Sequence, residues 1–137
     1  MPGGGEKREL IETLSGYATF SQCGRDDIAA LVDAGGPFAL PSGWPLVQEG
    51  IPADACYVLT SGSARIFHQR REIAEIGEGD LVGEMAFFDG GQRQATVTSS
   101  SRVTGLRIEN DALRGVLEKR PKLAEAFRAV YAAHHTS

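Results

Sequence analysis

Short apolar segments separated by turn residues occupy the middle of the chain, from Phe38 to Ile108. Most of these segments hold two to four apolar residues and end close to a glycine, a proline or a polar pair. Such a spacing is typical of an all-β protein. The strands expected from it cover residues 38–40, 45–48, 56–59, 64–67, 73–76, 94–99 and 103–108. Sharp bends of a small rolled barrel are expected at the glycines at 43, 50, 62, 77, 79 and 83.

Both ends of the chain show helical periodicity instead. Leu10, Ile11 and Leu14 predict a short amphipathic helix over residues 6–14, and a second helix is expected over residues 25–33. After Ile108 the apolar residues that recur at helical spacing are Leu113, Val116, Leu117, Leu123, Phe127, Val130 and Tyr131. The pattern therefore predicts a mainly β domain with flanking helices, two of them C-terminal.

Composition narrows the class of protein. The 137 residues carry a net charge of −4, and no segment is basic enough for direct nucleic-acid binding. Cys23 and Cys56 do not form a metal or disulfide motif, so we expect two reduced thiols. No apolar run approaches the roughly 18 residues of a membrane span, and the first residues do not resemble a signal peptide. We expect a soluble cytoplasmic protein with no membrane contact of its own.

Catalytic motifs are missing from the sequence. A metal site in a β-barrel needs clustered imidazoles and carboxylates, whereas His68 lies in a polar turn and His134 and His135 lie near the end of the chain. The sequence contains no GxSxG nucleophile motif and no phosphate-binding P-loop, and Ser99–Ser101 reads as a turn. We therefore expect neither an enzyme nor a metal site.

The segment Val82–Val97 combines groups that suit a nucleotide. Gly83 precedes a run, Glu84–Phe88, that is long enough for one helical turn, and the first N–H groups of such a turn favour an anion. Arg93 adds a planar fork of donors that can bind a phosphate through two hydrogen bonds. Glu84 can accept hydrogen bonds from sugar hydroxyls. A site for an anion next to a site for sugar hydroxyls suits a nucleotide, which carries both a phosphate and a ribose.

The same residues resemble a known motif. Gly-Glu-Met-Ala at 83–86, followed by Arg-Gln-Ala-Thr-Val at 93–97, resembles the phosphate-binding cassette of cyclic nucleotide-binding domains. That family includes the catabolite activator protein, protein kinase A regulatory subunits and cyclic nucleotide-gated channels. The resemblance covers about residues 14–130 and implies an antiparallel β-roll, jelly-roll-like, over residues 36–108. A helical lead over 6–35 and C-terminal helices over 110–134 would complete a single domain spanning 1–137.

The resemblance also implies roles for individual residues. Glu84 would bind the ribose 2′-hydroxyl and Arg93 the cyclic phosphate. Backbone amides of Ala86 and Gln94 would complete the phosphate cradle, with Gly83 allowing close approach. Met85 and Ala95 complete the predicted cassette contacts. The family commonly has proline where Gln92 stands and a small residue where Gln94 stands, which leaves the choice between adenine and guanine open.

Other contacts would come from outside the cassette. The resemblance places Ile66, Ile73 and Val82 against the nucleobase, although all three also suit an ordinary barrel core. It makes the last helix a lid over the base, with Phe127, Arg128 and Tyr131 as candidates, and a core-packing stripe is the alternative. We expect this helix to close when ligand binds, because nothing after it fixes its end.

Together these patterns predict a regulatory module that senses cyclic AMP in preference to cyclic GMP. Catabolite activator-type regulators place a DNA-binding domain after this barrel, and only six residues follow Tyr131. The expected partners are therefore the nucleotide and either a second copy of the chain or an effector domain absent from it. The alternative is a degenerate barrel that serves as a protein-contact scaffold and binds no nucleotide.

Overall fold

The computed structural model describes residues 4–51, 54–90 and 95–136, and Arg93 and Gln94 lie outside the described residues. The helices are α1 (Gly4–Ser15), the short 3-10 helix η1 (Ala18–Phe20), α2 (Arg25–Ala34), α3 (Glu84–Asp89), α4 (Asn110–Lys119) and α5 (Pro121–Thr136). The strands are β1 (Gly36–Leu40), β2 (Pro45–Val47), β3 (Ala55–Ser61), β4 (Ala64–His68), β5 (Arg71–Ile76), β6 (Leu81–Val82), β7 (Thr96–Ser99) and β8 (Val103–Glu109).

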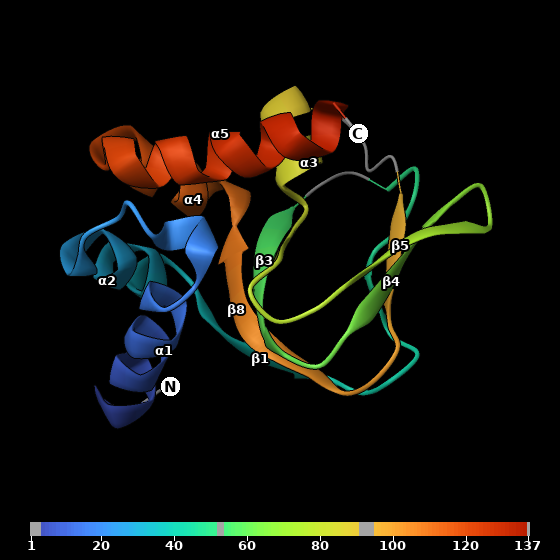
Figure 1. The fold of residues 1–137 in the computed structure, drawn as a ribbon, viewed down its shortest axis with the longest axis horizontal. Coiled ribbons are helices and arrows are strands. Elements are labelled where there is room, and N and C mark those ends of the chain that lie inside the picture. The colour runs from blue at the N-terminus through green and yellow to red at the C-terminus, as the bar shows by residue number, and fades with distance from the viewer. Residues whose placement is uncertain (1–3, 52–53, 91–94, 137) are drawn as a thin grey trace.

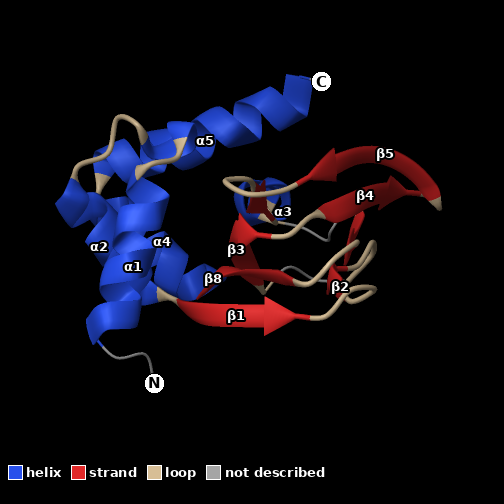
Figure 2. Cartoon of the chain, turned by 60° about the horizontal axis from the view of Figure 1, so that its bottom comes forward, coloured by secondary structure: helices blue, strands red, loops and turns tan. Residues whose placement is uncertain are grey.

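Two antiparallel sheets form the barrel. One has the strand order β1-β8-β3-β6 and the other the order β2-β7-β4-β5. Figure 1 shows the helices gathered along one side and across one end of the sheets, with the β4–β5 hairpin at the opposite side. Figure 2, after a 60° turn, shows α1, α2 and α4 together at one side of the strands and α3 among the strands, beside β3. The predicted fold class, an antiparallel β-roll flanked by helices, is confirmed.

Strand β3 separates two apolar cores because both of its faces are covered. Ala55, Tyr57 and Leu59 point into the barrel and meet residues of the other sheet, such as Val97. The intervening residues of β3 point the other way, into a core built with the helices, whose fully buried members include Leu14, Leu31, Leu113 and Phe127. A strand buried on both faces reads as a continuous apolar run, which explains why this strand does not alternate in sequence.

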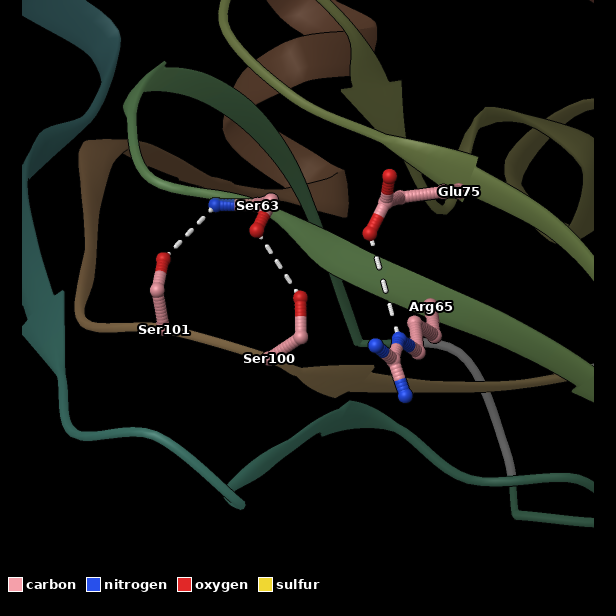
Figure 3. Close-up of polar contacts among 5 residues, drawn as sticks. All are labelled: Ser63, Arg65, Glu75, Ser100 and Ser101. Carbon is pink, nitrogen blue, oxygen red and sulfur yellow. Dashed lines mark hydrogen bonds and ion pairs between the residues drawn. The ribbon is translucent and has the colours of Figure 1, made fainter.

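Two turns at one end of the barrel are linked by serine side chains. Gly62 begins the β3–β4 turn with a φ of +84°, and a Cβ there would lie 2.1 Å from the carbonyl oxygen of Arg102. Figure 3 shows the backbone N–H of Ser63 donating to Oγ of Ser101 at 3.0 Å and the hydroxyls of Ser63 and Ser100 at 2.8 Å. The nearby Arg65 and Glu75 face each other across β4 and β5 at 3.8 Å. The predicted serine turn therefore joins β7 to β8.

Local details differ from the sequence expectations. The β4–β5 turn needs only Gln69 and Arg70, both at positive φ, whereas residues 68–72 were expected to form it. Cys23 is half-buried and Cys56 is buried, and neither forms a disulfide within the described residues. None of the helices within the described residues is long and apolar enough to cross a membrane.

Candidate functional site

The turn between β6 and α3 brings backbone donors and a carboxylate together. Gly83 adopts a left-handed conformation, with φ of 94° and ψ of −1°, and directly precedes Glu84, the first residue of α3. Glycine suits this position because a side chain is strained at positive φ. The N–H groups of the first turn of a helix have no carbonyl four residues earlier to bond. Met85 and Ala86, which follow in that turn, are half-buried and buried, respectively.

Glu84 is a buried acid. Its side chain is only 3% exposed, and its Oε2 atom lies 2.7 Å from Nδ1 of His134 on α5. An ionised carboxylate can only accept hydrogen bonds, so the histidine nitrogen donates. Burying a charged group is costly unless it is paired, and His134 provides that pairing. The imidazole itself is 42% exposed, at the outer edge of the contact.

The charges around His134 favour its protonated form. The hydrogen bond to Glu84 raises the pKa of His134 above its ordinary value of 6.5, and partial burial opposes this increase. The negative charges of Glu84 and Asp80 raise that pKa further. The end of α5 therefore favours the imidazolium form of His134, which faces the carboxylate of Glu84.

Helix α5 contacts α3 at two more places. The hydroxyl of Tyr131 donates to Asp89 at 2.6 Å, and the ring of Tyr131 lies 5.1 Å from that of Phe88. The guanidinium of Arg128 lies over the Phe88 ring at 5.1 Å. Figure 1 shows α3 crossing behind the C-terminal half of α5. Arg128, Tyr131 and His134 are three residues apart, so they share one face of the helix.

The turn before the cassette is held by the N-terminal part of the chain. The hydroxyl of Tyr17 donates to Glu78 at 3.1 Å, and the Tyr17 ring lies against Gly79. Burial and this hydrogen bond raise the pKa of Tyr17 to about 12. The hydroxyl of Thr19 reaches the carbonyl of Gly79 at 3.4 Å. The region around η1 therefore contacts the turn that leads into α3.

The predicted apolar contacts are not all equally available to a ligand. Val82 is buried beside the half-buried Ile66 in the barrel core, whereas Ile73 lies on the edge strand β5 and is 58% exposed. Phe127, predicted as a lid residue, is fully buried and packs 6.3 Å from Phe20 in the helical core. Tyr131 and Ala95 are both half-buried.

Two expectations about the last helix need correction. We expected little to fix its end, but Tyr131 near that end donates to Asp89, and the first half is anchored in the helical core by the fully buried Leu123 and Phe127. His134 was treated as a residue of the frayed end, yet it contacts the buried acid of the cassette turn. The sequence does show that His134 lies on the same helix face as Arg128 and Tyr131. It does not show that this face of α5 packs against α3. No group of three or more metal-ligating side chains occurs among the described residues.

Comparisons with known proteins agree on the fold and the family. The sequence model of the family described as "Cyclic nucleotide-binding domain" matches residues 37–120. A CRP-like cAMP-activated global transcriptional regulator of Mycobacterium tuberculosis is 30% identical over 128 residues, which are 90% of this chain and 57% of the relative. A cAMP-dependent protein kinase regulatory subunit of Aspergillus fumigatus is 33% identical over 114 residues, which are 82% of this chain and 25% of the relative.

Among solved structures, the regulatory domain of Toxoplasma gondii PKA crystallised with cAMP superposes with a TM-score of 0.84. Its sequence identity is 15%, and the match covers 96% of this chain and 50% of the other. At this identity the likeness concerns the fold alone. The chain spans about half the length of the Mycobacterium tuberculosis regulator. The match therefore does not show that this chain shares the regulator's activity.

Proposed function

The chain belongs to the cyclic nucleotide-binding domain family, and from this premise we propose that it binds a cyclic nucleotide at the turn into α3. The observation that carries the proposal is the buried carboxylate of Glu84 at the first position of α3, directly after the left-handed Gly83. Glu84 accepts the ribose 2′-hydroxyl, which is a donor that a carboxylate can bind. The N–H groups of the first turn of α3, together with Arg93, bind the cyclic phosphate.

Cyclic AMP is the proposed ligand, in preference to cyclic GMP. The two curated relatives described above are named for cAMP, and the similar Toxoplasma structure was crystallised with it. Ile66, Ile73 and Val82 supply apolar surface for the base, and Gln94 is the residue that we expect to influence the choice of base. Tyr131, at the edge of the cassette helix, is a further candidate to contact the ligand.

Binding is proposed to act through helices rather than through catalysis. Helix α3 holds the end of α5 through Phe88, Asp89 and Glu84, and Arg114 of α4 lies over the Phe87 ring at 5.5 Å. A ligand that binds α3 better in one arrangement of these helices shifts the equilibrium by its difference in affinity. The module is thus a cytoplasmic regulatory domain whose partner is a second copy or an effector domain.

A matched pair of arginine variants tests this proposal by isothermal titration with cAMP and cGMP. Arg93→Leu removes the charge-assisted phosphate contact, worth about 1.5–3 kcal/mol, so affinity for cAMP falls about ten- to a hundredfold. Arg25→Leu, on the exposed surface of α2, leaves affinity unchanged. Equal affinity of wild type and Arg93→Leu for cAMP would overturn the assignment.

One observation favours a second candidate, a scaffold that contacts proteins without nucleotide. The acid proposed to read the ribose is already bound by His134 at 2.7 Å. The same titration decides between the two candidates, because a scaffold gives no heat of binding with either nucleotide. A melting experiment gives the same answer, since saturating nucleotide does not raise the melting temperature of a scaffold.

A further inference from the structure

We propose that His134 is an autoinhibitory latch, which occupies the carboxylate of Glu84 and must leave before the sugar of a cyclic nucleotide can bind there. This inference rests on the proposed function and adds to it a regulation of the same site. It predicts that the end of α5 competes with the ligand, whereas a helix that only covers the ligand would assist binding.

The burial of Glu84 makes this competition necessary. Only 3% of the Glu84 side chain is exposed, and its Oε2 atom, which a sugar hydroxyl would need as an acceptor, lies 2.7 Å from His134 Nδ1. The imidazole of His134 is the more exposed member of the pair, at 42%. Displacing His134 is therefore the direct way to open Glu84 to a ligand.

The helix is built so that its end can separate without the rest. Leu123 and Phe127 anchor the first half of α5 in the helical core and are fully buried. Beyond Tyr131, by contrast, Ala132, Ala133 and His134 are all exposed. The last turn of a helix also leaves its carbonyl groups without helical partners. Unwinding the last turns releases His134 and leaves the anchor at Phe127 in place.

The charges around the pair make the latch respond to pH. His134 faces Glu84 on α3 and Asp80 in the turn before β6, while Tyr131, one turn earlier on α5, is paired with Asp89. The negative charges of both carboxylates favour the imidazolium, and the hydrogen bond to Glu84 is the largest cause of the raised pKa of His134. Ligand entry separates the pair, so the pKa returns toward 6.5 and a proton is released. Affinity for ligand therefore rises between pH of about 6.5 and the raised pKa of His134, by at most tenfold per pH unit, and levels off at higher pH.

Binding of cAMP by the whole chain, measured at about pH 6 and about pH 8, tests the latch. His134→Ala should bind cAMP about fivefold more tightly than wild type at the lower pH, since a half-exposed ion pair contributes about 1 kcal/mol. Its affinity should also vary less with pH. His134→Gln, which keeps a donor without a charge, should give a flat pH profile. His68→Gln controls for the exposed histidine on β4, which faces Glu49, and should behave as wild type.

An NMR titration of the histidines without nucleotide separates failure of the latch from failure of the proposed function. The pKa of His134 should lie above 6.5 in wild type and fall in Glu84→Gln. If that pKa is raised but neither wild type nor His134→Ala binds cAMP, the contact exists and the proposed function is wrong. If wild type binds cAMP and His134→Ala binds it equally or more weakly, the latch is refuted and His134 instead assists the ligand. An unshifted pKa of His134 also refutes the latch.

Discussion

Phe127 distinguishes an anchored last helix from a mobile lid. Its side chain is fully buried, lies 6.3 Å from the Phe20 ring and belongs to the same core as Leu14, Ile28 and Leu113. Removing a buried aromatic ring leaves a cavity and typically costs about 3–5 kcal/mol. Domains of this size have a total stability of about 5–15 kcal/mol, so Phe127→Ala should lose a large share of it.

Calorimetric melting and urea unfolding measure this loss. For a domain of this length, a loss of about 4 kcal/mol lowers the melting temperature by about 10 °C or more. Val130→Ala, on the same helix but only half-buried, should cost about 1 kcal/mol and serves as the control. A Phe127→Ala protein with unchanged stability but weakened cAMP binding would refute the anchored helix and restore Phe127 as a lid residue.

Two further predictions concern stability alone. Because the pKa of His134 is raised in the folded state, its stabilisation is fully present below pH 6.5 and is lost as pH rises through the raised value. Urea unfolding of wild type and His134→Ala across this range should show a difference of about 0.5–1 kcal/mol at low pH that disappears at high pH. Gly62→Ala should destabilise the fold by about 1–3 kcal/mol more than Gly43→Ala. Both glycines have positive φ, but only at Gly62 would a Cβ meet a carbonyl oxygen, and equal melting temperatures would contradict this.

Local patterns predicted the cassette turn and each strand of the described residues except β6 (Leu81–Val82), because the causes of these elements are local. The left-handed Gly83 and the turn residues between apolar segments act on their immediate neighbours. The position of Phe127 was left between lid and core, since a helical stripe of apolar residues suits both and only the packing against Phe20 separates them.

The contact between Glu84 and His134 was not predicted because it joins residues fifty positions apart. Its formation depends on where the face of α5 that carries Arg128 and Tyr131 meets α3. No local pattern fixes that meeting point. Sequence identified Glu84 through its motif, whereas the structure was needed to show what already binds it.

The most direct test of the central assignment compares cAMP with 2′-deoxy-cAMP on wild type and Glu84→Ala. If Glu84 binds the ribose 2′-hydroxyl, the substitution weakens cAMP binding by about tenfold or more and weakens binding of the deoxy analogue much less. Isothermal titration of the four combinations gives the coupling between the carboxylate and the hydroxyl. A loss of equal size for both nucleotides would contradict the account, because Glu84 would then not contact that hydroxyl.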